Sequence, residues 1–103
     1  RPDLLSINCT KSPAREETTF VLSHDRPGSE LSVRIAVCDF SGRELWVHNE
    51  QGISNGGYYY VDWDLCSNAG QRLSPGVYLF RASIISENSK ESTKTEKIVI
   101  LAQ

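Results

Sequence analysis

The sequence predicts an all-β domain built as an antiparallel sandwich. Several segments alternate apolar and polar residues with a period of two, which is typical of a strand with one buried face. Short clusters of Gly, Pro, Asn and Ser separate these segments at nearly even spacing. No stretch has the 3.6-residue period of an amphipathic helix. The length of 103 residues indicates one domain, covering positions 1–103.

Four strands are predicted in the first half of the chain. They span residues 4–10, 18–24, 31–40 and 43–50. The third is the clearest, because in LSVRIAVCDF the aliphatic residues alternate with Ser, Arg, Ala and Cys. This alternation predicts a half-buried strand with an apolar inner face and a mixed outer face.

Three further strands are predicted in the second half. They span residues 58–65, 76–85 and 94–102. The segment 76–85 carries Val77 and Leu79 opposite its main apolar face, so we expect a central strand that is covered on both sides.

We expect the two layers to close around Phe20, Trp63, Tyr78 and Phe80. About seven strands in a chain of this length are typical of an immunoglobulin-like sandwich. The Cys-Trp-Cys arrangement of antibody domains is absent, so this likeness concerns the architecture.

Composition and charge exclude some classes of function. Lys and Arg number 11 against 13 Asp and Glu, a formal net charge of −2 without a long run of one sign. A basic stripe for nucleic acid and a polybasic segment for anionic membranes are therefore absent. No apolar stretch approaches the roughly 20 residues of a transmembrane helix. The chain begins Arg1-Pro2 without a signal peptide, so we expect a piece excised from a longer protein.

The cysteines do not indicate a metal site. Cys9, Cys38 and Cys66 are odd in number and lack CxxC spacing, which argues against a zinc knuckle or a dense disulfide framework. Three free thiols are the favoured interpretation, and one bridge plus one free thiol is the alternative.

Asp62 and Asp64 flank Trp63 and raise the question of a calcium or acid–base site. Calcium requires six to eight oxygen ligands, and the following SNAG loop supplies few. We therefore expect Asp62 to be solvated and Asp64 to accept hydrogen bonds from backbone N–H groups of the turn. No metal or cofactor is predicted.

No catalytic residue is predicted in this domain. His24 and Asp25 are neighbours on a strand, so their side chains point to opposite faces. Cys38 and Cys66 lack an adjacent base and an orienting group. The run Tyr58-Tyr59-Tyr60 suits recognition at a rim, but equally a strand with one inward ring and two half-exposed rings.

Four motifs in order carry a resemblance to a known family. They are Val37-Cys38-Asp39-Phe40-Ser41-Gly42, Trp63-Asp64, the segment from Ala69 and Gly70 to Gly76, Val77 and Tyr78, and the terminal Lys97-Ile98-Val99-Ile100. The Asp39–Gly42 and Ser74–Gly76 segments have the composition of tight turns. The pattern resembles the immunoglobulin-like domain of the flagellar hook-cap protein FlgD and the C-terminal sorting domains of the type IX secretion system. The segments HDRPG and DLCSNAG look most like the C-terminal domain of that system's sortase. The opening segment departs from the family, since Ser12-Pro13 stands where Asn-Pro is common.

The resemblance implies a non-catalytic signal that directs its parent across the outer membrane. Its partners would be the translocon and an outer-membrane β-barrel shuttle protein. Its expected location is the cell surface, which it reaches after export through the periplasm. The resemblance also implies a parent similar to a cysteine peptidase acting as a transpeptidase, with the catalytic residues upstream of Arg1. On most cargo such a signal is removed, whereas the sortase is expected to retain it.

The candidate partner-binding residues are Lys97, Ile98, Val99, Ile100 and Leu101 of the last strand, with Tyr58 and Tyr60. A partner would contact one face or the free edge of that strand. The alternative is a strand buried on both faces that only stabilises the sandwich. Two other classes stay open: a spacer or assembly module, and a carbohydrate-binding accessory module that uses the tyrosine run. Exposed sheet edges also allow a homodimer or strand exchange.

Overall fold

The computed structural model describes residues 5–87 and 90–103. These residues form seven β-strands and no helix, as the alternating pattern predicted. The strands are β1 (Leu5–Cys9), β2 (Thr18–His24), β3 (Glu30–Cys38), β4 (Glu44–Ile53), β5 (Tyr58–Trp63), β6 (Gly76–Ser86) and β7 (Ser92–Ile100). Each predicted strand is present, and no end is shifted by more than three residues. Leu4, placed in the first predicted strand, lies outside the described residues.

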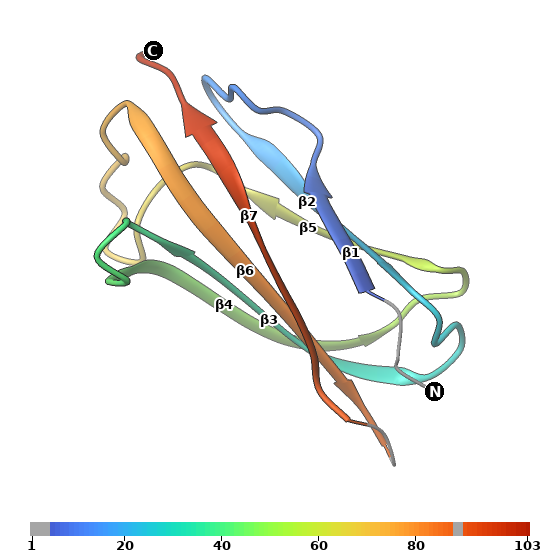
Figure 1. Ribbon diagram of the computed structural model, residues 1–103. Helices are drawn as coiled ribbons and strands as arrows, with labels where there is room; N and C mark the ends of the chain where they lie inside the picture. The colour runs from blue at the N-terminus through green and yellow to red at the C-terminus, as the bar shows by residue number, and fades with distance from the viewer. Residues whose placement is uncertain (1–4, 88–89) are drawn as a thin grey trace.

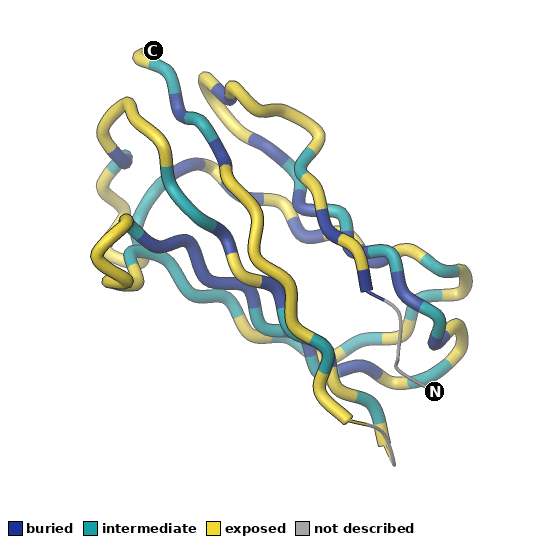
Figure 2. The backbone as a smooth tube through the Cα atoms, viewed as in Figure 1, coloured by how far each residue is buried: buried dark blue, intermediate teal, exposed yellow. Residues whose placement is uncertain are grey.

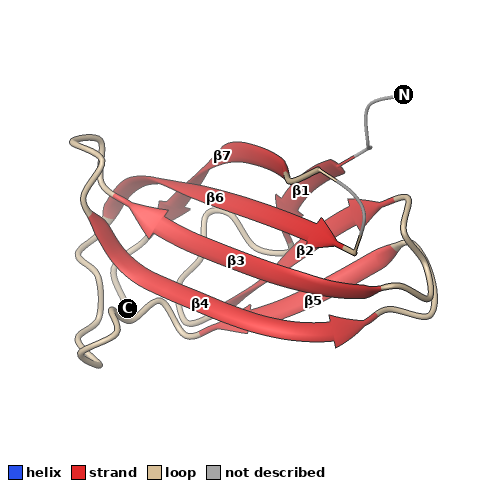
Figure 3. Ribbon diagram, turned by 90° about the horizontal axis from the view of Figure 1, so that it is seen from below, coloured by secondary structure: helices blue, strands red, loops and turns tan. Residues whose placement is uncertain are grey.

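Two antiparallel sheets face each other, which confirms the predicted sandwich (Figure 1). One sheet has the order β1–β2–β5 and the other the order β4–β3–β6–β7. At one margin of the sandwich β1 lies beside β7, and at the other margin β4 lies beside β5 (Figure 3). No helix long and apolar enough to cross a bilayer occurs in the described parts of the chain.

After β1 the chain crosses from the first sheet to the second. The crossing passes through the cis peptide bond between Ser12 and Pro13. Ala14 then lies parallel to the end of β7: its N–H donates to the Val99 carbonyl at 2.8 Å, and its carbonyl accepts from the Leu101 N–H at 2.8 Å. The N-terminal segment thus contributes to both sheets.

The core lies between the two inner faces, where Figure 2 shows the buried positions alternating along the strands. Phe20 is at its centre, with its ring centroid 4.8 Å from that of Phe80 and 5.7 Å from that of Trp63. Trp46 of β4 adds a further ring at 5.9 Å. Three of the four predicted core residues are therefore buried, whereas Tyr78 is only half-buried at the rim.

The outer face of the β4–β3–β6–β7 sheet differs from the prediction in two ways. β6 is central in its sheet, but its second face is not covered: Val77 is 43% exposed and Leu79 half-buried. Conversely, the outward Ala36 and Cys38 are buried, since these small side chains lie between longer ones such as Arg81 on the paired strand. Alternation identified the faces, but it did not show which face a second layer covers.

The turn between β3 and β4 has the predicted chemistry. Asp39 Oδ1 accepts the backbone N–H groups of Ser41 and Arg43, both at 3.0 Å. The hydrogen bond from the Ser41 hydroxyl, supported by these N–H groups, lowers the pKa of Asp39. Gly42 has φ of +90°, a conformation that residues with a Cβ rarely adopt.

Candidate functional site

The structure separates the predicted partner-binding residues into two groups. The terminal strand β7 lies at the β1/β7 margin, whereas Tyr58 and Tyr60 lie on β5, at the β4/β5 margin of the other sheet. One continuous interface therefore does not join them, and each group has its own surroundings.

β7 is an edge strand that pairs only with β6 among the named strands. Along an antiparallel pair, successive residues direct their backbone groups alternately toward the partner strand and away from it. Val99 points away from β6, because its N–H donates to Ser12 Oγ at 3.0 Å and its carbonyl accepts from Ala14. The register is continuous from Ser92 to Ile100, so Thr93, Thr95 and Lys97 also direct their N–H and C=O groups to the outer edge.

The outer edge of β7 therefore has a closed end and an open end. At the closed end, Ala14 pairs with the strand, Arg72 donates to the Leu101 carbonyl at 2.9 Å, and Arg15 donates to the Ala102 carbonyl at 2.6 Å. At the open end, no backbone partner within the described residues lies outside Thr93, Thr95 or Lys97. We call residues 93–97 the open edge of β7.

The side chains of the terminal motif have different environments. Ile98 and Ile100 belong to the core, with 0% and 1% of their surface exposed. Lys97 is exposed, and Val99 and Leu101 are half-buried. A partner can therefore reach Lys97 and part of Val99, while the two isoleucines hold the strand in its sheet.

The tyrosine run alternates across β5. Tyr59 is buried, while Tyr58 and Tyr60 are 56% and 62% exposed, with ring centroids 6.4 Å apart. The inward Tyr59 hydroxyl donates to the Glu50 carboxylate, and burial together with this hydrogen bond raises the pKa of Tyr59 to about 12. Gly52 makes room for this ring, because a Cβ there would lie 2.7 Å from the Tyr59 hydroxyl oxygen.

A shallow hollow lies beside the two exposed rings. It is formed by the β4–β5 turn and the strands that flank it, and its volume is about 560 Å³. The side chains that matter for recognition are those of Gln51, Ile53, Asn55, Tyr58 and Tyr60. We call this site the tyrosine hollow.

Buried His24 supports the turn under the tyrosine hollow. Its Nδ1 accepts the Arg26 backbone N–H at 3.0 Å, so in the neutral ring Nε2 carries the proton. Nε2 then donates to Ser54 Oγ at 2.6 Å, and Ser54 Oγ donates to the Gly56 carbonyl at 2.9 Å. Burial, and secondarily the Arg26 cation, lower the pKa of His24, which favours this neutral form.

Asp62 and Asp64 border a second hollow of about 610 Å³. Asp62 accepts the Thr19 hydroxyl at 2.8 Å. Asp64 accepts the Cys66 backbone N–H at 3.0 Å, which confirms its predicted role in the turn. No group of three or more His, Cys, Asp or Glu side chains within residues 5–87 and 90–103 is arranged to hold a metal ion.

Motif residues near this turn serve the fold. The Trp63 indole N–H donates to the Cys66 carbonyl at 2.9 Å, and the Gly70 N–H, in a residue with φ of +83°, closes the turn on the Ser67 carbonyl at 2.9 Å. The Tyr78 hydroxyl donates to the Ser74 carbonyl at 2.6 Å, across the turn before Gly76. These side chains hold the loops at one end of the sandwich.

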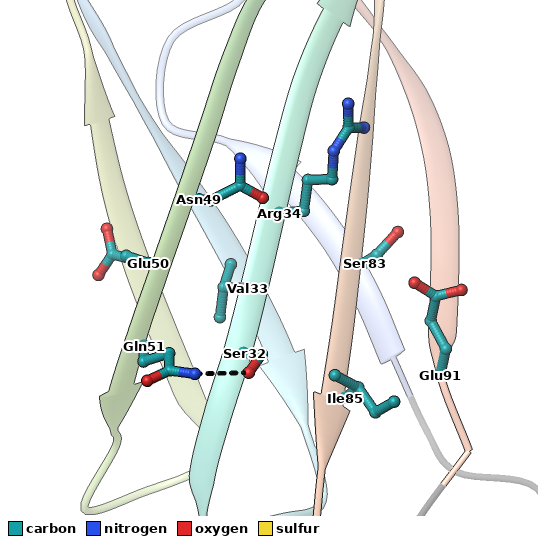
Figure 4. Close-up of a pocket in the computed structure, with 9 residues that line it drawn as sticks. All are labelled: Ser32, Val33, Arg34, Asn49, Glu50, Gln51, Ser83, Ile85 and Glu91. Atoms are coloured by element: carbon teal, nitrogen blue, oxygen red, sulfur yellow. Dashed lines mark hydrogen bonds between the residues drawn. The ribbon is translucent and has the colours of Figure 1, made fainter.

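A third hollow crosses the outer face of β4, β3 and β6 (Figure 4). Its polar side chains bond weakly to each other, as in the 3.4 Å contact from Gln51 Nε2 to Ser32 Oγ. Arg34 at its border donates to Glu44 at 2.9 Å. The arrangement contains neither a nucleophile with a base nor a set of ligands.

The three cysteines are free thiols. Burial raises the pKa of Cys9 and Cys38, and desolvation with the neighbouring Asp64 carboxylate raises the pKa of Cys66. Each thiol therefore remains protonated at neutral pH, which is unfavourable for a nucleophile.

Sequence reasoning missed two polar side chains that hold the structure together. Buried Arg26 donates to the Lys90 carbonyl at 3.0 Å and to Ser92 Oγ at 2.9 Å, fastening the start of β7 to the β2–β3 loop. Asn68 closes the outer edge of β4: its amide oxygen accepts the Val47 N–H at 2.7 Å, and its amide nitrogen donates to the Val47 carbonyl at 3.1 Å. Both residues lie in loops, so no periodicity indicates their roles.

The fold and these surfaces define an immunoglobulin-like module with two candidate binding regions. No family model and no curated protein matches the sequence. Among solved structures the chain is similar to PorU from Porphyromonas gingivalis, in the crystal structure of its dimeric latent form, with 31% identity and a TM-score of 0.84. The match covers 100% of this chain and 10% of the PorU chain. It confirms the predicted resemblance to the C-terminal domain of PorU, for which HDRPG and DLCSNAG were the closest segments.

The chain thus spans about a tenth of the length of PorU. This is consistent with a small non-catalytic domain of a larger protein. A second similar structure, CopC from Methylosinus trichosporium OB3b, has a TM-score of 0.60 at 11% identity and covers 98% of this chain and 95% of that one. At this identity the likeness concerns the fold alone.

Proposed function

We propose that this domain is a non-catalytic C-terminal signal and docking domain of the type IX secretion system. It directs its parent across the outer membrane and holds it on a β-barrel partner similar to PorV. The parent resembles the gingipain-like sortase PorU, a cysteine peptidase and transpeptidase, and acts at the cell surface. The similarity to PorU over the whole chain supports this proposal.

The observation that carries the docking proposal is the open edge of β7. Thr93, Thr95 and Lys97 offer a row of backbone donors and acceptors to an incoming strand. An extended segment of the partner adds to such an edge through main-chain hydrogen bonds. The closed end, fixed by Ala14, limits the added strand to residues 93–97 and thereby sets its register.

The outer face next to this edge supplies side-chain contacts. Val77 and Leu79 of β6 are paired with Val99 and Lys97 of β7, so they form an aliphatic strip with a cation at its border. An added strand would extend this strip and bury part of it. Apolar burial then adds affinity to the directional main-chain bonds.

A proline at the open edge tests the proposal. Thr95 directs its N–H outward, so Thr95→Pro removes an edge donor without breaking the β6 ladder. We expect Thr95→Pro to weaken binding to a purified PorV-like barrel in detergent by about tenfold or more, whereas Thr95→Ala binds like the wild type. Biolayer interferometry measures the affinity and thermal unfolding checks the fold.

Unchanged binding by Thr95→Pro, or no binding of the wild-type domain to the barrel, contradicts the docking proposal. If Thr95→Pro unfolds, Thr93→Pro near the strand's start repeats the test with less effect on packing. Light scattering is measured in parallel, because the same edge is open to a second copy of the chain. A dimer that is lost in Thr95→Pro while barrel binding persists assigns the edge to self-association instead.

A further inference from the structure

The second candidate region has a different chemistry. The tyrosine hollow and the hollow beside Asp62 both border β5, where Tyr60 and Asp62 are successive outward positions. Neither hollow contains a Lys or Arg among its described lining residues. Together they form a shallow track of aromatic rings, amides, hydroxyls and carboxylates.

The end of the track at Tyr58 and Tyr60 contains one acid, and its carboxylate is already hydrogen-bonded within the fold. Glu50 is its only described acid, and one Glu50 oxygen accepts the Tyr59 hydroxyl while the other lies 2.5 Å from His48 Nε2. Burial opposes ionisation, yet these hydrogen bonds from Tyr59 and His48 lower the pKa of Glu50. The Glu50 carboxylate is therefore hydrogen-bonded to neighbouring side chains of the fold. The other groups that the hollow offers to a ligand are the rings of Tyr58 and Tyr60 and the amides of Gln51 and Asn55.

The hollow is also held in shape before any ligand arrives. The β4–β5 turn is hydrogen-bonded to His24 in two places. The Ser54 hydroxyl accepts from the His24 ring, and the Gly57 carbonyl accepts the His24 backbone N–H at 2.8 Å. The Gly28 N–H donates to the Ser54 carbonyl at 2.9 Å. Such support reduces the ordering cost of binding.

We propose that the tyrosine hollow binds a neutral polysaccharide. The ring faces of Tyr58 and Tyr60 contact the C–H faces of hexopyranose units, and the amides of Gln51 and Asn55 exchange hydrogen bonds with the sugar hydroxyls. Exposed aromatic area suits a ligand with apolar C–H faces and many hydroxyls. Nucleic acid and anionic glycans are disfavoured by the lack of basic residues, and a cationic peptide would meet in this hollow a single acid, Glu50, whose two oxygens already bond to Tyr59 and His48.

The hollow beside Asp62 favours a polymer over a single sugar as the ligand. Beyond Tyr60 the track continues to Asp62, whose carboxylate is oriented by Thr19 and retains acceptor positions for hydroxyl donors. A polymer bound at the tyrosines would extend along β5 into this region. The site is independent of the open edge of β7, at the opposite margin of the sandwich.

Native affinity electrophoresis tests this proposal. Gels contain a soluble galactomannan, a xyloglucan, a mixed-linkage β-glucan or a yeast mannan, with anionic alginate as the charge control. We expect at least one neutral polysaccharide to retard the domain. Tyr58→Ala and Tyr60→Ala should each weaken that retardation by about tenfold. Phe40→Ala is the matched control, because Phe40 is 64% exposed but lies on the distant β3–β4 turn.

Three outcomes overturn the proposal: no retardation in any neutral gel, retardation unaffected by both tyrosine substitutions, and retardation in alginate alone. Binding of the same variants to the PorV-like barrel separates a protein contact from a glycan contact. Loss of barrel binding in Tyr60→Ala without any binding to the neutral polysaccharides assigns the tyrosines to the barrel and overturns the glycan site. Unchanged barrel binding with weakened retardation supports it.

Discussion

The two outer faces of the sandwich have opposite character. On the β1–β2–β5 sheet, the outward side chains are Ser6, Asn8, Thr19, Val21, Ser23, Tyr58, Tyr60 and Asp62, and these described positions include no base. On the β4–β3–β6–β7 sheet, the outward positions include aliphatic Val77, Leu79 and Ile85 and basic Arg34, Arg81 and Lys97. One fold therefore offers an aromatic surface without bases and an aliphatic surface that carries bases.

The sheet edges differ in the same way. The outer edge of β4 is closed at Val47 by the Asn68 amide, whereas the outer edge of β7 is open over residues 93–97. Lys94, Thr95, Glu96 and Lys97 make this open edge polar and exposed. Charged side chains on an edge discourage indiscriminate pairing and leave it available to a specific strand. The contrast shows that the loops decide which edges of the sandwich remain open.

The largest effect is expected from a substitution in the core, because the side chains there pack between the two sheets. Phe80 is fully buried beneath the β4–β3–β6–β7 sheet, so Phe80→Ala should lower the free energy of unfolding by about 3–5 kcal/mol. Val77→Ala, on the open face of the same strand, should cost about 1 kcal/mol or less. Urea denaturation measures both, and equal losses would mean that the outer face of β6 is covered in solution.

The next effect concerns the start of β7. Arg26→Ala removes hydrogen bonds to the Lys90 carbonyl and Ser92 Oγ, and should destabilise the domain by about 1–3 kcal/mol. Amide hydrogen exchange should increase at Lys94 and Glu96, whose N–H groups face β6, but not at Tyr59, whose N–H faces β2. Arg43→Ala is the control, since that arginine is largely exposed. Faster exchange at both margins alike would contradict a local fastening role.

A smaller effect is expected at the closed edge of β4. Asn68→Ala removes both side-chain bonds to Val47 and should cost about 1 kcal/mol in unfolding free energy. The uncovered edge should also increase self-association, measured by analytical ultracentrifugation. Asn8→Ala serves as the control, because the Asn8 side chain is exposed and has no described hydrogen bond. An unaltered sedimentation profile would show that an open β4 edge alone is insufficient for association.

The smallest expected effect is a pH dependence of the folding stability. It arises from His24, which supports the turn at the tyrosine hollow. The pKa of His24 lies below its ordinary 6.5, so the unfolded chain binds this proton more readily than the folded one. The stability that His24 contributes is therefore fully present above pH 6.5 and is lost as pH falls below that value. Urea midpoints at about pH 7.5 and about pH 5.5 should differ less in His24→Gln than in the wild type. An identical difference in both proteins would contradict this role.

Much of the fold follows from local patterns in the sequence. Residues 18–24 form β2 with the predicted bounds, because Phe20 and Leu22 lie two residues apart on one face and a turn signal follows His24. The bonds of Asp39 and Asp64 to backbone N–H groups two residues on are equally local. The uncovered outer face of β6 and the roles of Arg26 and Asn68 were missed, because each depends on contacts between distant segments.

The sequence by itself determined that this chain is a β-sandwich, which side chains share a face in the segments 18–24, 31–40, 58–65 and 76–85, and that it resembles PorU. These properties reside in the period of two, in turn chemistry and in short motifs, all of which are local. Only the tertiary structure decided that β7 is an edge strand with one end closed by Ala14, and that Tyr58 and Tyr60 lie at the opposite margin. Strand order is set by pairing between residues far apart in the chain, and side-chain periodicity within one strand carries no information about its neighbours.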